Sequence, residues 1–179
     1  MALGRTGEGE PARITKVSKQ YIDRPVGLRE LRSLRQLALA ELDAFFIRNP
    51  HLIAPYRRRL LAAALCQGAA LQFLGCGYGV HDFDVHFFYS QNPKKPLLAR
   101  AVLHRRASVG RFPGVRVDFI RTVVPRRVLL SRVTDPIAQI RAFLIRAPTS
   151  NAKHLAAKAV VGLLPQSIFG VTIWPDPDA

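Results

Sequence analysis

The stretch His81-Asp82-Phe83-Asp84-Val85 decides how the centre of this chain is interpreted. Alternate side chains of a β-strand point to opposite faces, so the two aspartates would share one face and the apolar residues the other. Between Asp43 and Asp135 only one further carboxylate occurs, Asp118, among fifteen Lys and Arg residues. Each of the three acids lies inside an apolar, strand-like run, which is unlike the scatter of charges that merely solubilise a surface. A strand with an apolar back and a paired-acid front suggests a metal site.

The segments before and after this stretch show helix and strand patterns in turn. Apolar residues recur at helical spacing over residues 28–46, and Asn49-Pro50 ends that helix. A short helix over 54–59 leads into 60–66, which fits either a buried strand or more helix. The patterns that follow predict a helix over 69–73, a glycine-rich loop over 75–79, a strand over 81–89, a turn over 92–96, a helix over 97–106, a loop over 110–114 and a strand over 115–124.

The last third of the chain reads mainly as helix. Thr134 or Asp135 would cap a helix that has Pro136 in its first turn and runs to about Arg146. Another helix, capped at residues 150–151, would continue until Pro165, and residues 167–174 fit a strand or an extended packing arm. The order of elements predicts an α/β or α+β domain, with a small mixed sheet flanked by helices.

Composition predicts a single domain. The chain has 179 residues, of which 49% are hydrophobic and 22% charged, enough for a substantial core. We expect residues 1–13 to form a disordered N-terminal segment and residues 14–179 to form one domain with a helical C-terminal part. No apolar run approaches the roughly 18 residues needed to cross a bilayer, and the N-terminus lacks the apolar core of a secretion signal. We therefore expect a cytoplasmic protein without membrane contacts, in which Cys66 and Cys76 form no disulfide framework.

The charge balance favours a polyanionic partner. Net charge is +15, from 27 basic and 12 acidic residues. Neutralising phosphates supplies affinity without sequence preference, so nucleic acid or a nucleoside triphosphate would fit. An alternative is that Arg simply covers the surface, and no aromatic residues interleave with the basic ones as they do in proteins that stack single-stranded bases. The candidate phosphate contacts are the clustered arginines Arg57, Arg58, Arg59, Arg105, Arg106, Arg126 and Arg127.

Three features together resemble the DNA polymerase β-like nucleotidyltransferase superfamily. They are Gly68-Ala69, the alternating acids Asp82 and Asp84 twelve residues later, and Asp118 on a later strand. In that superfamily a Gly-Ser or Gly-Gly pair opens a short helix, two acids alternate on the next strand, and a third acid comes from a neighbouring strand. The resemblance covers roughly residues 60–124. The chain departs from the pattern at Ala69, where relatives carry a Ser whose hydroxyl contacts the phosphate.

The resemblance implies a two-metal nucleotidyl transfer. Asp82, Asp84 and Asp118 would hold two Mg²⁺ ions, with Mn²⁺ as an alternative, because Mg²⁺ prefers carboxylate and phosphate oxygens. Asp118 would also receive the proton of the attacking hydroxyl. The residues expected to bind the triphosphate are Gly68 and Ala69 through their backbone amides and, from a late helix, Lys153 or Lys158.

The favoured acceptor is RNA, such as tRNA, because a +15 domain attracts nucleic acid and repels cationic small substrates. A role related to toxin–antitoxin systems would fit this choice. Two other classes stay open. A metal-dependent nuclease also gathers acids on strands, although its commonest fold needs an acid-x-Lys triplet and none occurs here. The other class is a non-catalytic module that binds nucleic acid or a partner protein and keeps the fold.

Each acid also has a purely structural interpretation. Asp82 would be a turn residue, Asp84 an ordinary edge-strand acid, and Asp118 the ion-pair partner of Arg116 or Arg121. Against this, two carboxylates on one strand face repel each other unless a cation lies between them. A zinc site at Cys76, His81 and His86 is disfavoured, because the spacing matches no common zinc motif and no fourth ligand is evident.

Overall fold

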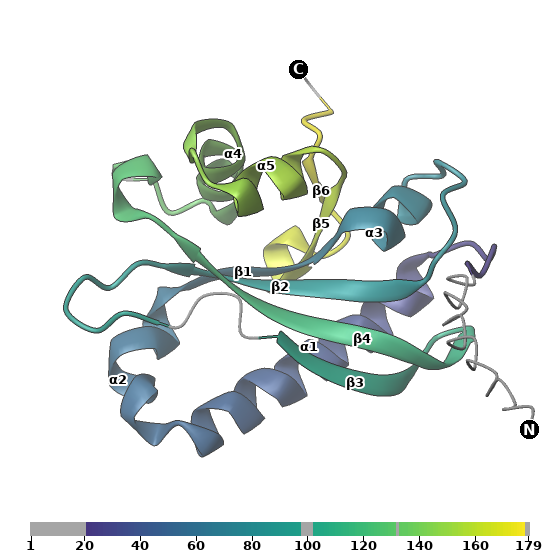
Figure 1. Cartoon of the computed structure of the whole chain (residues 1–179), viewed down its shortest axis with the longest axis horizontal. Helices are drawn as coiled ribbons and strands as arrows, with labels where there is room; N and C mark the ends of the chain where they lie inside the picture. Colours follow the sequence, from purple (N-terminus) through teal and green to yellow (C-terminus); the bar gives the residue numbers. More distant parts are fainter. Residues whose placement is uncertain (1–20, 98–101, 132, 178–179) are drawn as a thin grey trace, which may run out of the picture.

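A six-stranded mixed sheet forms the centre of the protein (Figure 1). The structure is a computed structural model and describes residues 21–97, 102–131 and 133–177. The strand order is β3-β4-β2-β1-β5-β6, and only β2 and β4 pair in parallel. The strands are β1 (Leu60–Cys66), β2 (Asp82–Ser90), β3 (Val102–Val109), β4 (Phe112–Val124), β5 (Val160–Leu164) and β6 (Thr172–Trp174).

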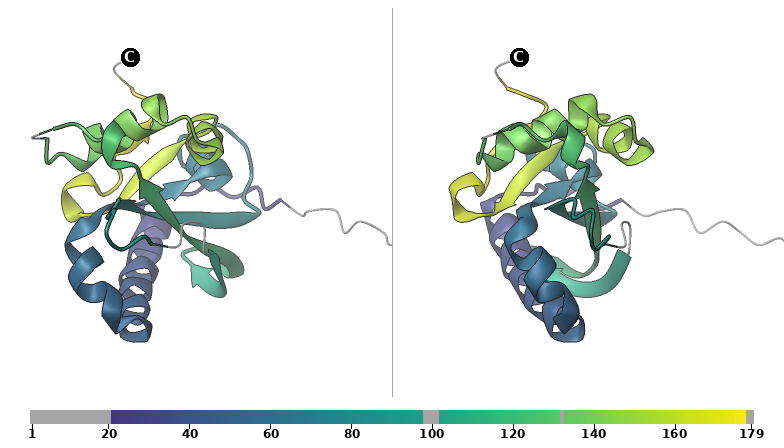
Figure 2. Two further views of the ribbon diagram at one scale, coloured as in Figure 1. Left: turned by 60° about the vertical axis from the view of Figure 1, so that its left-hand side comes forward. Right: turned by 90° about the vertical axis from the view of Figure 1, so that its left-hand side faces the viewer.

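Helices cover both faces of the sheet (Figures 1 and 2). The long helix α1 (Leu28–Arg48) lies across one face, while α4 (Pro136–Arg146) and α5 (Ser150–Ala156) lie on the other. The remaining helical segments are α2 (Ile53–Tyr56), α3 (Gln67–Phe73) and the 3₁₀ turns η1 (Pro50–Leu52), η2 (Arg57–Arg59), η3 (Arg126–Val128) and η4 (Gln166–Ile168). Within the described ranges, no helix combines the length and the apolar character that crossing a membrane requires.

Alternation along β2 divides the sheet into two chemically different faces. Phe83, Val85 and Phe87 join the apolar core beneath α1, and the in-register residues of β4 extend that core. Asp82 and Asp84 therefore point to the α4 and α5 side of the sheet, as the sequence predicted. That side has its own apolar core, which includes Phe88 and Phe143. The two acids therefore lie beside an otherwise apolar, packed face.

Several sequence predictions are confirmed. The architecture is mixed α and β, with α1 close to its predicted bounds and residues 60–66 forming the buried strand β1 rather than more helix. Helix α4 begins and ends where predicted, and the carboxylate of Asp135 accepts hydrogen bonds from the backbone amides of Ile137 and Ala138 at 3.0 and 3.3 Å. The expected disordered segment, residues 1–13, lies outside the described residues.

One predicted helix is wrong, and another ends earlier than predicted. Residues 102–106 belong to the edge strand β3, which pairs with β4, and the other residues of the predicted 97–106 helix lie mainly outside the described ranges. Pairing with β4, which starts at Phe112 rather than at residue 115, overrides the helix-favouring composition. Helix α5 ends at Ala156, and residues 160–164 form the fully buried strand β5. At Gly162 a Cβ would overlap the carbonyl oxygen of Ile168, so this strand depends on a glycine for its packing.

The predicted helix over residues 54–59 is shorter than expected. The α-helical part is α2, and the three arginines that follow form the 3₁₀ turn η2. The last predicted strand, within residues 167–174, is reduced to β6. These differences move boundaries without changing the fold class.

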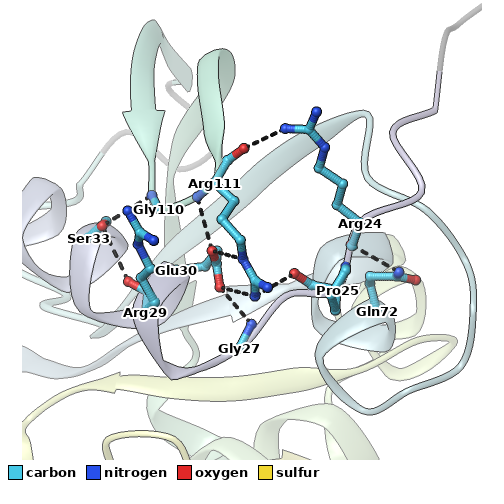
Figure 3. A network of polar contacts seen from close by, with 9 residues as sticks. All are labelled: Arg24, Pro25, Gly27, Arg29, Glu30, Ser33, Gln72, Gly110 and Arg111. Carbon is cyan, nitrogen blue, oxygen red and sulfur yellow. Dashed lines mark hydrogen bonds and ion pairs between the residues drawn. The ribbon is translucent and has the colours of Figure 1, made fainter.

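A buried carboxylate ties the start of α1 to the turn between β3 and β4 (Figure 3). Glu30 has no exposed surface, and its oxygens accept hydrogen bonds from the Gly27 amide, the Arg111 amide and the Arg111 guanidinium at 2.9 to 3.2 Å. Burial alone would raise the pKa of Glu30, but the hydrogen bonds from Arg111 and the backbone outweigh it and lower that pKa to about 2. One side chain thus caps a helix and anchors a hairpin.

Replacing Glu30 should destabilise the protein strongly. The substitution Glu30→Ala leaves buried amide donors without an acceptor, so we expect the free energy of unfolding to fall by about 2–4 kcal/mol in urea denaturation at pH 7. Because the folded pKa lies below the ordinary 4.5, this contribution is complete above pH 4.5 and is lost as the pH falls toward 2. As a control, Arg24→Ala removes only an exposed hydrogen bond to the Arg111 carbonyl and should cost under about 1 kcal/mol. Equal losses for both variants would contradict the assigned role.

Candidate functional site

Asp82 and Asp84 open into a cavity of about 320 Å³ on the α4 and α5 side of the sheet. Both lie at the start of β2, just after the loop that follows α3. Neither carboxylate forms a hydrogen bond or a short ion pair with another described residue. The paired acids predicted from the sequence are therefore available to a ligand.

The junction between β1 and α3 forms one wall of this cavity, through Gln67, Gly68 and Ala69. Gln67 has φ of 68°, a left-handed conformation that a non-glycine residue rarely adopts. Backbone strain of this kind is concentrated at functional sites. The left-handed residue is thus Gln67, while Gly68 provides space, because a Cβ there would lie 3.1 Å from the ring of Tyr78.

Asp118 lies beside Asp84 across the parallel pair β2–β4. Its oxygens are held by Arg116, whose Nε and Nη2 donate at 2.7 and 2.8 Å, and Nδ1 of His104 lies 2.7 Å from Oδ1. Asp118 does not line the cavity. Of the interpretations that the sequence left open for this acid, the structure therefore contains the ion pair with Arg116.

The three acids are neighbours, but they do not converge as a formed metal site. Among residues 21–97, 102–131 and 133–177, no group of three or more His, Cys, Asp or Glu side chains is arranged to hold a metal ion. Burial raises the pKa of Asp118, but the hydrogen bonds from Arg116 and His104 outweigh that effect and hold its pKa below the ordinary value. Asp118 is thus ionised and already neutralised by its neighbours.

Asp84 has the opposite electrostatic environment. Burial, and then the negative charges of Asp82 and Asp118, raise its pKa to about 7, although Lys158 and Arg116 oppose the shift. The carboxylate form of Asp84 is therefore poorly stabilised by the protein alone. A cation placed between Asp82 and Asp84 would favour that form.

Basic side chains from the segment around α5 face the two acids. Lys158 and His154 line the cavity, and Nζ of Lys158 lies 5.2 Å from the centroid of the Tyr78 ring. Lys153, the other lysine predicted to contact a triphosphate, is exposed and does not line the cavity. The structure therefore brings one of the two predicted lysines to the acids.

Sequence reasoning missed the aromatic rim of the cavity. Tyr21 and Tyr78 line it, and their rings meet edge to face with centroids 6.5 Å apart. The ring of His81 also lies against Tyr21, with centroids 5.9 Å apart. The only local signal was a tyrosine inside a glycine-rich loop, and Tyr21 reaches the cavity through the long-range bridge between Ile22 and Val80.

The residues considered for zinc do not form a site. Cys76 is exposed, whereas His86 is buried beside Thr122, with its Nδ1 2.8 Å from the Thr122 hydroxyl oxygen. Burial, and then the charge of His154, lower the pKa of His86 to about 3, so its imidazole is neutral. Burial has the opposite effect on Cys66 and raises the pKa of its thiol. Cys66 lies opposite Asp84 in the β1–β2 pair.

The predicted nucleic-acid contacts fall into separate groups. At the end of β2 away from the acids, the Arg59 guanidinium donates to the Gln91 carbonyl and the Arg126 backbone amide donates to Oε1 of Gln91, both at 3.3 Å. Their neighbours Arg57, Arg58 and Arg127 are exposed nearby in the chain. Gln91 lies seven residues beyond Asp84 along an extended segment, a distance of roughly 23 Å. Exposed arginines thus form a basic end that is distinct from the acid-lined cavity.

The two arginines of β3 point to opposite faces of the sheet. Arg105 forms an ion pair with the buried Glu41 of α1 at 2.7 Å, so its charge is compensated within the fold. Arg106 follows on the other face, where it donates to the Gly114 carbonyl at 3.1 Å. Of this pair, Arg106 is the residue on the same side as the acids.

Comparisons with known proteins bring no further constraint on this site. No family model, no curated protein and no solved structure matches the chain. Functional conclusions therefore depend on the geometry and electrostatics given above.

Removing the charge of Asp84 should stabilise the folded protein at high pH only. Well below pH 3.8, Asp84 is protonated in both the folded and the unfolded state. As the pH rises from there toward 7, the unfolded chain loses its proton first, so stability falls. We expect Asp84→Asn to raise the free energy of unfolding by roughly 1–3 kcal/mol at pH 8 and by little at pH 4. Chemical denaturation in EDTA at the two pH values measures this, with Asp43→Asn as an exposed control. A gain that did not depend on pH would be inconsistent with the raised pKa.

Proposed function

We propose that the protein is a metal-dependent nucleotidyltransferase that moves a nucleoside monophosphate from a triphosphate to a hydroxyl acceptor. The observation that carries this proposal is the arrangement of Asp82 and Asp84 on one strand face, open to a cavity that also contains Lys158. A third acid, Asp118, lies in register on the parallel neighbouring strand. Order along the chain and spacing agree with the superfamily that residues 60–124 resemble.

The residues fit a divalent cation. Asp82 and Asp84 offer hard oxygen ligands that have no hydrogen-bond or short ion-pair partner among the described residues, and the raised pKa of Asp84 indicates a carboxylate that is only partly compensated. Mg²⁺ held there would supply charge neutralisation at the phosphates and activation of the attacking hydroxyl. Asp118 would join the ligands or accept the hydroxyl proton only after Arg116 and His104 released it.

The rest of the cavity suits a nucleotide. Lys158 and His154 face the acids and would contact phosphate oxygens, as would backbone amides at Gly68 and Ala69. Tyr21 and Tyr78 offer ring faces or edges against which a base would pack. The missing hydroxyl at position 69 leaves the phosphate contacts to Lys158, His154 and the backbone.

RNA is the acceptor that the charge distribution favours. Net charge is +15, and the basic end with Arg57, Arg58, Arg126 and Arg127 lies roughly 23 Å from the acids. An acceptor whose 3′ hydroxyl lies in the acid-lined cavity would need to span this distance to contact the basic end as well. A folded RNA such as tRNA is large enough to do so.

One observation favours a second candidate, a non-catalytic module that binds nucleic acid or a partner protein. The bidentate pairing of Asp118 with Arg116 neutralises the acid that the reaction needs. In a protein without catalytic activity, Asp118 could stay paired with Arg116. The two candidates differ in whether Mg²⁺ and a nucleoside triphosphate are used.

Transfer activity separates the two candidates. Full-length protein incubated with Mg²⁺, total RNA and each labelled nucleoside triphosphate in turn should label RNA with one of them. We expect Asp82→Asn and Asp84→Asn each to lower the rate at least about 100-fold, because each removes a metal ligand. The exposed acid in Asp43→Asn provides the matched control and should leave the rate unchanged. Labelling that survived the Asp82→Asn and Asp84→Asn changes would refute the assignment.

A second measurement does not depend on finding the right acceptor. Mg²⁺ that binds only the folded state raises its apparent stability by mass action. Thermal unfolding at pH 7.5 should therefore shift upward with millimolar Mg²⁺ in the wild type and in Asp43→Asn, but not in the Asp82→Asn/Asp84→Asn double variant. An equal shift in all three proteins would argue for non-specific ion binding and for the non-catalytic module.

The basic end should determine how RNA binding responds to salt. Each phosphate contact contributes about 0.7–0.9 to the slope of log affinity against log salt concentration. We expect Arg126→Gln/Arg127→Gln to reduce this slope by about 1–2, measured with tRNA by fluorescence anisotropy. The matched control Arg29→Gln/Arg146→Gln removes two exposed charges elsewhere. If both double variants gave the same slope, a localised RNA contact at the basic end would be excluded.

A further inference from the structure

A second cavity, lined mainly by polar side chains, lies on the α1 side of the sheet, away from Asp82 and Asp84. It has a volume of about 280 Å³ and is lined by Arg32, Arg35, Gln36, Gln166 and Phe169. The first three residues come from α1, and the others from η4 and the residue that follows it. It shares no lining residue with the acid-lined cavity, so the two are independent sites.

The charges in this cavity are uncompensated within the described chain. Neither Arg32 nor Arg35 forms an ion pair or a hydrogen bond with another described residue, whereas Arg48, Arg105 and Arg111 are paired with Glu41 or Glu30. The Nε atom of Arg35 is shielded from solvent and has no hydrogen-bond partner among the described residues. Because that atom is closed to a ligand as well, an acceptor in the cavity would bind the terminal nitrogens of the guanidinium groups.

The lining specifies the chemistry of that acceptor. Two guanidinium groups on one helix face, one turn apart, suit the tetrahedral oxygens of a phosphate group, which arginine binds in bidentate fashion. Gln36 and Gln166 add amide donors and acceptors, and the partly buried ring of Phe169 offers a flat apolar wall. Phosphate next to a flat ring is the chemistry of a nucleotide.

We propose that the cavity between α1 and η4 binds the phosphate of a nucleotide, either free or within RNA. Its lining, as far as the structure describes the chain, carries positive charge and no carboxylate, so phosphate binding there would not use a divalent ion. It would retain a nucleotide independently of the acid-lined cavity on the other face of the sheet. Its function would be recognition, because its described lining residues include neither an acid nor a nucleophile.

Binding of AMP, inorganic phosphate and a labelled single-stranded RNA to full-length protein in EDTA tests this site. We expect Arg32→Gln/Arg35→Gln to weaken binding of AMP or of RNA at least about tenfold. The control Arg29→Gln/Arg146→Gln removes the same charge at exposed positions and should change it less than about twofold. Competition by inorganic phosphate against AMP would show that phosphate is the recognised group, and tighter binding of AMP than of phosphate would identify a free nucleotide as ligand. An effect seen with RNA alone would identify a nucleotide of RNA.

A further variant distinguishes bidentate phosphate binding at Arg35 from a general charge effect. Arg35→Lys keeps the charge but removes the planar guanidinium group, so it should still lose several-fold in affinity if Arg35 binds phosphate in bidentate fashion. Equal weakening in both double variants, or wild-type affinity in Arg35→Lys, would overturn the proposal, as would absence of binding to all three probes.

Discussion

In-register pairing of two parallel strands, β2 and β4, determines the electrostatics of this protein. It puts Asp84 directly beside Asp118 on a half-buried surface, where two ionised carboxylates are costly. The two carboxylates are compensated to different degrees. Arg116 and His104 compensate Asp118, while Asp84 remains next to Asp82 with only partial help from Lys158 and a pKa near 7. The apolar cores on both faces hold these strands in register and so keep the carboxylates close together despite their mutual repulsion.

The elements that line the acid-lined cavity come from distant parts of the chain. Tyr21 arrives before α1, the β1–α3 junction supplies Gln67, and Lys158 follows α5. None of these segments contributes to the cavity by local structure alone; each is positioned by packing on the same sheet. The unusual backbone of Gln67 lies where these segments meet, consistent with a locally strained residue supported by a well-packed surrounding.

Sequence patterns predicted the parts of the fold that depend on short-range physics. Strand alternation placed Asp82 and Asp84 on one face, and a capping residue with a following proline marked the start of α4 at Asp135. Residues 102–106 and 160–164 were misassigned because sheet pairing decided their conformation, and their composition also suits helices. The same limit applies to the site: the sequence offered Lys153 or Lys158 as a triphosphate contact, but the presence of Lys158 in the cavity together with Tyr21 and His154 depends on tertiary contacts.

The contact between Glu30 and Arg111 also bears on how the chain acquires its structure during synthesis. The two residues are 81 positions apart, and at typical rates of about 5–20 residues per second the ribosome needs several seconds to add the second after the first. During that interval the carboxylate at the start of α1 has no guanidinium partner, and β2 has no β4 to pair with. The nascent N-terminal half therefore exposes both an unfinished helix start and a strand edge of β2, and these two are covered only after the hairpin of β3 and β4 has emerged.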